Sequence, residues 1–455
     1  MISAPRLQRP WLLLLLLAAP GCLRLPEVQV RPVPPGARLI IVDDHGPLAP
    51  DLAQARVLER LGPAPGDALG RALREQAVTG APLSAGNRVE LLFDGPQTLG
   101  AMMASIQAAK VSINLETYIF EGDELGQTFA NLLIAKQQQG VQVNLIYDAV
   151  GTVGTPEAFF ERMRTAGIRL CKFNPLTPFK GQGWRPNERD HRKILVVDDR
   201  VAFAGGANIS GTYKFRSLFR HRVRPGSGSL GWRDTHLKLE GPAVASLQRL
   251  FAATWAAQTG RALAPSPAGP PAAGEALVRV VAGTPDGSYA IYRAYLLAIA
   301  QATRSIHLTA SYFVPDPQLL DSLKRAAKRG VAVEIVLTTV TESSLLQHAS
   351  QASYRELLES GVRLFRLNRS LLHAKTAVVD GVWSTVGSSN LDRRSFLFNQ
   401  EVNVIVLGAP FGQELENAFR EDQRNSTELT LEFWLRRSRR DRLKDQLASW
   451  LGYFL

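Results

Sequence analysis

Short apolar runs alternate with amphipathic helical stretches along most of the chain, and the same alternation occurs twice. Residues 194–197 are continuously apolar, which is typical of a strand covered on both faces. Residues 125–139 and 318–329 are predicted helices, and each precedes a Gly-Val strand pattern. The matched segments are 113–123 with 306–316, 140–143 with 330–333, and 167–170 with 361–364. This repeat predicts an α/β protein with two similar sandwich domains related by pseudo-two-fold symmetry, which share one active-site cleft.

Changes in composition along the chain predict the boundaries of the two domains and of the segments outside them. We expect a signal peptide over 1–21, a Pro-rich tether and helical segment over 22–88, and the first domain over 89–262. A Pro/Gly/Ala linker over 263–276 leads to the second domain, 277–430, and to a basic amphipathic tail, 431–455. Residues 50–78 are predicted to be helical.

One polar motif recurs at a constant step. His191, Lys193, Asp198 and Asn208 are repeated 182 residues later as His373, Lys375, Asp380 and Asn390. Small residues precede each Asn at the same offset: Gly205 and Gly206 in the first copy, Gly387 and Ser388 in the second. A lone His-x-Lys pair is usually structural, but a repeat of the whole constellation indicates a functional site.

The Asp-Gly pair of the second copy predicts a two-residue hairpin turn. The pairs expected from this turn are Val379 with Val382, Lys375 with Val386, and His373 with Ser388. An equivalent turn in the first copy would place His191 opposite Gly206. On this register the small residues would let a phosphate approach the backbone N–H groups. Asp198 and Asp380 have the wrong parity to share the histidine face, so we interpret them as structural turn residues.

Two imidazoles in one site are suited to phosphoryl transfer. One can attack phosphorus while the other protonates the leaving oxygen. Two lysines and two asparagines supply donors for the phosphate oxygens, so the chemistry requires no metal and no cofactor.

The duplicated motif resembles the signature of the phospholipase D superfamily, and residues 387–395 with 399–401 resemble bacterial cardiolipin synthases. Further resemblance lies in 118–120, 232–236 and 312–316, and the whole covers roughly 89 to 455. It implies phospholipase D-type domains and a phosphohistidine intermediate, with His191 as nucleophile by family habit. It also implies that Asp234 and Glu401 each orient a histidine, although the sequence does not assign which. Gly206 departs from the Gly-Ser of many members.

The expected activity is a phosphatidyltransferase that makes cardiolipin from phosphatidylglycerol or another phosphatidyl donor. Hydrolysis of phospholipid headgroups through the same intermediate is the main alternative. A nuclease and a non-catalytic lipid-binding lipoprotein are weaker alternatives. The sequence does not identify the headgroup donor, the oligomeric state or an accessory protein.

A net charge of +12 and a pI near 9.9 favour an anionic partner. The export signal disfavours nucleic acid, which leaves anionic phospholipids and a membrane surface. Two basic segments interleaved with aromatic residues, 213–224 and 434–454, are suited to a membrane interface. The alternative for the tail is a solvated helix docked on the body.

The N-terminus resembles a bacterial lipoprotein signal that ends at Cys22. We therefore expect Cys22 to be lipidated and the protein to be exported and anchored on the periplasmic side of the outer or inner membrane. The second cysteine, Cys171, is expected to be a buried, inert thiol.

Overall fold

The computed structural model describes residues 25–29, 32–61, 67–176, 185–214, 231–264, 269–339, 344–368 and 370–451. The predicted signal peptide, the lipidation site at Cys22, residues 215–224 of the basic loop and the last four residues of the tail lie outside these ranges.

The first half is built on a mixed sheet in the order β6-β5-β4-β8-β9-β11-β3. Its strands are β3 (Leu83–Phe93), β4 (Ser112–Thr117), β5 (Gln142–Asp148), β6 (Arg169–Phe173), β8 (Ile194–Val197), β9 (Val201–Gly205) and β11 (Thr235–Glu240). Its helices are α3 (Asp94–Ala108), α4 (Glu124–Gln138), α5 (Glu157–Thr165) and α6 (Val244–Thr259).

The second half repeats this order as β16-β15-β13-β18-β19-β21-β12, with β22 added beyond β16. Its strands are β12 (Ala276–Gly283), β13 (Ser305–Ala310), β15 (Ala332–Thr338), β16 (Arg363–Leu367), β18 (Lys375–Val379), β19 (Trp383–Gly387), β21 (Asn399–Leu407) and β22 (Ser426–Leu429). Its helices are α7 (Ala290–Gln301), α8 (Pro317–Lys328), α9 (Ser344–Gln351), α10 (Tyr354–Glu359) and α12 (Ala409–Arg424). The predicted pair of similar α/β domains is confirmed.

Short elements complete the two halves. They are β7 (Arg189–Asp190), β10 (Trp232–Arg233), β14 (Phe313–Val314), β17 (Leu371–Leu372), β20 (Leu391–Asp392), α11 (Arg393–Leu397) and the 3-10 helix η3 (Gly211–Lys214).

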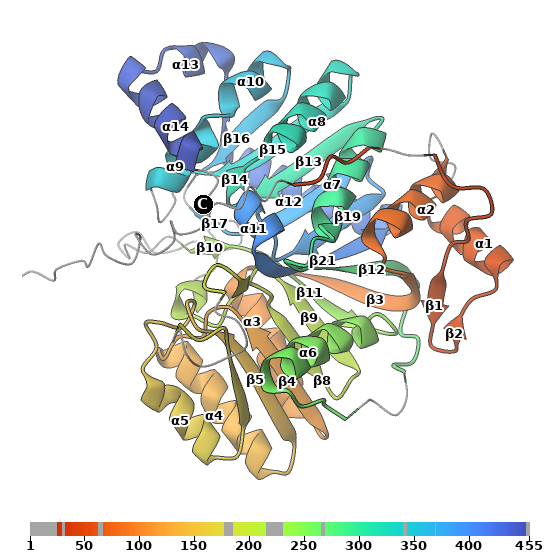
Figure 1. Ribbon diagram of the computed structural model, residues 1–455, viewed down its shortest axis with the longest axis vertical. Helices are drawn as coiled ribbons and strands as arrows, with labels where there is room; N and C mark the ends of the chain where they lie inside the picture. Colours follow the sequence, from red (N-terminus) through yellow and green to blue (C-terminus); the bar gives the residue numbers. More distant parts are fainter. Residues whose placement is uncertain are drawn as a thin grey trace, which may run out of the picture.

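The two sheets are joined edge to edge and covered in layers (Figure 1). β3 pairs antiparallel with β12, so the halves share hydrogen bonds as well as side-chain contacts. Helices α3, α4 and α5 pack on the outer face of the first sheet. The inner faces of both sheets, with α6 and α12, form one central apolar cluster. Ile194 and Val196 point into that central cluster while Leu195 and Val197 point to the outer one, which explains the continuous apolar run.

The predicted two-residue turns are wrong by one position. Val379 pairs with Trp383 and Val197 with Val201, so each hairpin loop has three residues. The reason is the aspartate at the start of each loop. Asp198 accepts backbone N–H groups from residues 110, 111 and 112 at 2.7–2.9 Å, and Asp380 accepts those of residues 303, 304 and 305 at 2.7–3.1 Å. These bonds tie the loop to the neighbouring strand, at the end of β8 or β18 remote from the histidine.

The N-terminal segment is docked on the second half instead of being a free tether. It contains β1 (Ile41–Asp43), β2 (Gly46–Pro47), α1 (Pro50–Leu61) and α2 (Ala68–Thr79), and α1 and α2 pack on the core that contains α7. Gln318 donates to the Val28 carbonyl at 3.0 Å. The described part of the Pro-rich stretch therefore lies against the body of the protein, because its apolar residues bury there.

The basic tail forms α13 (Leu431–Leu435) and α14 (Arg439–Leu451), which pack beside α9 and α10 (Figure 1). Among the helices that the structure describes, none combines the length and apolar character needed to cross a bilayer.

Candidate active site

The two histidines lie on segments that each run beside a strand of the opposite half. β7 precedes His191 and pairs in parallel with β21, whereas β17 precedes His373 and pairs in parallel with β10. The His191 N–H donates to the Gln400 carbonyl at 2.9 Å, and the His373 N–H donates to the Arg233 carbonyl at 2.8 Å. Each half therefore fixes the backbone of the histidine that the other half supplies.

The orienting acids cross between the halves in the same way. Nδ1 of His191 lies 3.0 and 3.1 Å from the two carboxylate oxygens of Glu401. Nδ1 of His373 lies 2.8 Å from Oδ2 of Asp234. An N–H at Nδ1 that donates to a carboxylate leaves Nε2 with a lone pair that can attack or accept a proton. The structure thus answers the question that the sequence left open.

The lysines and asparagines complete the two sets. Lys193 donates to the His191 carbonyl at 2.5 Å, and Lys375 donates to the His373 carbonyl. Oδ1 of Asn208 accepts the Ile119 N–H at 3.2 Å, and Oδ1 of Asn390 accepts the Ser311 hydroxyl at 2.9 Å. Both amide oxygens are therefore engaged, and the NH₂ group is the end of each side chain that can donate to a phosphate oxygen.

This geometry coincides with a family likeness over most of the chain. The family described as "Cardiolipin synthase, PLD-like domain" matches residues 102–213 and 295–423, one segment in each half. The cardiolipin synthase of Geobacillus kaustophilus is 35% identical over 381 residues, which are 82% of this chain and 74% of that one. The chain belongs to the phospholipase D-like cardiolipin synthase family.

Two other relatives extend the likeness. The cardiolipin synthase of Listeria innocua is 35% identical over 382 residues, 83% of this chain and 77% of that one. The crystal structure of the phosphatidylserine synthase of Haemophilus influenzae is 15% identical, with a TM-score of 0.62 over 84% of this chain and 99% of that chain. At that identity the crystal structure shares the fold alone.

Burial and the two ammonium groups set the charges of the site. Burial lowers the pKa of Lys193 to about 7 and that of Lys375 to about 8. Burial, followed by the charge of Lys375, lowers the pKa of His373 to about 3, and burial also lowers the pKa of His191. The charge of Lys375 contributes to lowering the pKa of His191, and the charge of Lys193 contributes to lowering that of His373. The residues of the two motif copies are therefore close enough to interact electrostatically. Both imidazoles are neutral at pH 7 without substrate.

Both acids are ionised in this environment. Burial acts to raise the pKa of Asp234, but His373, the charge of Lys375 and the Thr235 N–H together outweigh burial and lower the pKa to about 2. Burial likewise opposes ionisation of Glu401, and its contacts with His191 lower the pKa overall. A bound phosphodiester would offset the lysine charges and so favour protonation of one imidazole, as general acid catalysis requires.

The lysine pKa values predict the alkaline limit of the reaction. A lysine is cationic below its pKa, so attraction for a phosphodiester is present at low pH and is lost as the pH rises through about 7 to 8. We expect kcat/KM for a soluble short-chain phosphatidylglycerol to fall over this interval, and Lys193→Arg to move the fall to higher pH. A pH profile of the two proteins measures the effect. An alkaline limit that is the same in both would contradict this assignment.

The small residues that precede each asparagine are packed against protein, which corrects the expectation that they make room for a phosphate. A Cβ on Gly206 would lie 2.1 Å from Oδ1 of Asp234, and one on Gly387 would lie 2.1 Å from Oδ1 of Asn403. A Cβ on Gly205 would lie 2.6 Å from the Cα of His236. The N–H groups at 206 and 388 donate to the carbonyls of Thr235 and Val402, so they form part of the sheet instead of an anion site.

Gly206 stands where many family members have serine, and the reason is the length of the acid that orients the histidine. In the second half Ser388 occupies the equivalent position, and its hydroxyl donates to Glu401 at 2.5 Å. In the first half the shorter Asp234 brings its carboxylate against the Gly206 backbone, which leaves no space for a side chain. Serine is therefore compatible with glutamate at this position, and glycine with aspartate.

We expect Gly206→Ser to lower the transfer rate more than Ser388→Gly does. Gly206→Ser should displace Asp234 and lower the transfer rate by about 100-fold, since a shift near 1 Å in a positioning group has that cost. Ser388→Gly removes one hydrogen bond to an acid that Asn399 also contacts, so the expected loss is about tenfold or less. Initial rates of the two folded variants test this order, and equal losses would refute it.

Sequence reasoning missed the aromatic walls of the site. Tyr118 packs edge-on against the His191 ring with centroids 5.0 Å apart, and Trp232 packs at 4.9 Å from His373. In the sequence, both lie in segments that carry the family resemblance, 118–120 and 232–236. Trp232 lies two residues before Asp234, and Tyr118 directly follows the buried strand β4. These positions are the sequence signal that could have placed both rings in the site. The side chain of Arg192 donates to the Glu401 carbonyl at 3.1 Å, so it also ties the halves together.

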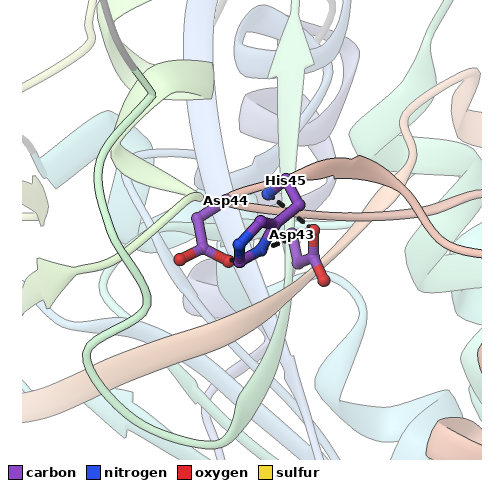
Figure 2. A group of neighbouring side chains, drawn as sticks. All are labelled: Asp43, Asp44 and His45. Atoms are coloured by element: carbon purple, nitrogen blue, oxygen red, sulfur yellow. Dashed lines mark hydrogen bonds and ion pairs between the residues drawn. The ribbon is translucent and has the colours of Figure 1, made fainter.

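Figure 2 shows Asp43, Asp44 and His45, which form the one group of three potential metal ligands within 4.8 Å of each other in the described ranges. His45 lies 2.9 Å from Asp44, and its N–H donates to Asp43 at 2.8 Å. The second oxygen of Asp44 accepts the Ala272 N–H at 3.0 Å. These bonds hold the β1-β2 turn against the linker between the halves, which is a structural role.

Proposed function

We propose that this protein is a phosphatidyltransferase that makes cardiolipin from two molecules of phosphatidylglycerol through a phosphatidyl-histidine intermediate. The observation that carries the proposal is the crossed pair of histidine–acid contacts, which leaves Nε2 of each imidazole available for chemistry. Each histidine also feels the charge of the other half's lysine, which supports a single shared site. Membership of the cardiolipin synthase family, over 82% of the chain, supports phospholipid as the substrate class.

We assign nucleophilic attack to His191, as the family resemblance implies. Its Nε2 forms a bond to phosphorus while the bond from phosphorus to the headgroup glycerol oxygen breaks. His373 donates the Nε2 proton to that oxygen, and glycerol leaves. A hydroxyl of a second phosphatidylglycerol then gives its proton to His373 and attacks phosphorus, and the P–N bond breaks. The two lysines and two amide groups stabilise the negative charge on the phosphate oxygens in both steps.

The products decide between transfer and hydrolysis. The purified full chain is incubated with phosphatidylglycerol vesicles, and the lipids are extracted and identified by mass spectrometry. Transfer predicts cardiolipin and glycerol in equal amounts. Phosphatidic acid in place of cardiolipin would make the protein a hydrolase with the same intermediate. If neither lipid appears, the proposed function is lost.

We also propose that the protein is exported and lipidated at Cys22. The sequence pattern at residues 1–22 supports this location. Metabolic labelling with an alkyne fatty acid should mark the wild-type protein and spare a Cys22→Ala variant; labelling of both proteins would overturn the assignment.

A further inference from the structure

The C-terminal helices present an apolar face that the rest of the described structure leaves uncovered. We call this the outer face; its residues are Phe433, Leu435, Leu443, Leu447 and Trp450. Leu443 is 57% exposed and Trp450 is 71% exposed. Leu443, Leu447 and Trp450 are spaced by four and three residues on α14, and exposed apolar side chains of this size grouped in this way indicate an interaction surface.

The opposite side of the same helices is fixed to the body. Asp445 on α14 bonds His348 on α9 at 2.7 Å and Arg437 at 2.5 Å. Trp434 packs on the Tyr354 ring with centroids 5.2 Å apart. Asp445 and Ala448 therefore mark the docked side of α14. Positions 443, 447 and 450, spaced by four and three residues, fall on the other side of the helix.

Basic residues flank the outer face. Arg439, Arg440 and Lys444 are exposed and make no ion pair within the described part of the chain. At 3.6 residues per turn, Arg439 and Arg440 lie on either side of the row formed by Leu443 and Leu447. An apolar row between guanidinium groups matches the boundary between acyl chains and anionic headgroups. A protein partner would also cover apolar atoms, but the density of cations favours phospholipid.

The outer face adjoins a cavity that reaches the segment following Asn390. Ser449 and Trp450 line a cavity of about 670 Å³ together with the start of α8 and Arg393 of α11. Arg393 follows Asn390 by three residues. A surface that lies beside this cavity would bring the site to the layer in which its substrate is dissolved.

We propose that the outer face of α13 and α14 docks on an anionic phospholipid bilayer and holds the active-site side of the protein against it. The apolar row enters the interface, and Arg439, Arg440 and Lys444 contact the headgroups. The orienting role rests on the proposed phospholipid chemistry, whereas the docking itself does not.

Depth-dependent quenching tests the proposal with the full chain. A fluorophore is attached at Leu447→Cys or at Leu52→Cys, and quenching by brominated phosphatidylglycerol in mixed vesicles is compared with the label on the unsubstituted chain. Leu52 is a matched control, since it is 58% exposed and lies on α1, on the far side of the molecule in Figure 1. We expect strong quenching at 447 and background quenching at 52. Equal quenching at the two positions would overturn the proposal.

Charge variants test the choice of lipid. Arg439→Gln with Arg440→Gln should weaken the quenching at 447 by about tenfold in apparent affinity, whereas Arg56→Gln on α1 should not change it. Vesicles of phosphatidylcholine alone should give little quenching. Equal quenching by neutral vesicles would contradict the electrostatic part of the proposal.

Two further measurements separate the possible failures. Leu443→Asp with Leu447→Asp should abolish transfer on vesicles while leaving transfer of monomeric short-chain phosphatidylglycerol unchanged. If no substrate reacts in either form, the proposed function fails, and the quenching result still decides the docking. Light scattering that shows a dimer, converted to a monomer by the same two substitutions, would assign the outer face to a second copy and overturn membrane docking.

Discussion

His191→Ala and His373→Ala are each expected to lower the rate of phosphatidyl transfer from phosphatidylglycerol by about 10³-fold to 10⁴-fold. Removing His191 eliminates the atom that bonds to phosphorus. Removing His373 leaves the departing glycerol oxygen without its proton donor. Both imidazoles are largely buried and contact a carboxylate, so alanine also deprives a buried anion of one of its hydrogen-bond partners. Initial rates of cardiolipin formation, with folding checked by circular dichroism, measure the effect.

His307→Asn provides the matched control. His307 is also buried and also has a carboxylate partner, with Nδ1 2.6 Å from Glu416, but it lies on β13 outside the site. The first half has Asn114 at the equivalent position, so the fold accepts this side chain. Its variant should retain nearly full activity. A loss as large as that of the two alanine variants would mean that the assay reports folding instead of catalysis.

A substrate with a good leaving group separates the two roles. Phosphatidyl-p-nitrophenol needs no proton on its leaving oxygen, so His373→Ala should recover the first step with this substrate, measured as a rapid burst of p-nitrophenol. The second step, in which His373 is the base, should stay slow. His191→Ala should remain inactive, because no nucleophile is present. The opposite pattern would exchange the two assignments and leave the rest of the mechanism intact.

Asp234→Asn and Glu401→Gln are expected to lower transfer by about 10³-fold, although neither side chain contacts the phosphate in the proposed mechanism. Each carboxylate fixes Nδ1–H of one imidazole and stabilises the cation that forms when Nε2 takes a proton. An amide can present its NH₂ group to Nδ1, which would move the proton to Nε2 and block attack. Steady-state kinetics should show the loss in kcat.

The p-nitrophenyl substrate also tests the crossing of the pairs. Glu401 contacts His191, so Glu401→Gln should stay slow with the good leaving group, as His191→Ala does. Asp234 contacts His373, so Asp234→Asn should recover the burst of p-nitrophenol that reports the first step. If the acids acted within their own halves, the recovery would appear in the other variant.

The repeat in the sequence predicted much of the fold because each half obeys local rules. The helices expected at 125–139 and 318–329 are α4 and α8 within one residue at each end. The turn register failed for a tertiary reason. The Asp-Gly pair favours a two-residue loop, but Asp380 binds three backbone N–H groups of a distant segment, and those bonds decide the loop length.

The sequence predicted which residues form the site, but it did not predict which residues of the two halves contact each other. Motif spacing identified His191 and His373, whereas pairing between β7 and β21 depends on how the halves dock, and no local pattern encodes that. The same limit applies to Gly206. Its small size was visible in the sequence, but the Asp234 carboxylate that requires it comes from a distant segment, between β10 and β11.

The crossed contacts between β7 and β21 and between β10 and β17 have a consequence for how the protein becomes active. A half expressed alone would carry a histidine without the carboxylate that sets its tautomer. Recovery of activity during refolding should therefore lag behind recovery of helix content, and the lag should report the docking of two already folded units. A shorter ancestor with one motif copy would have had to exchange these contacts between two identical chains.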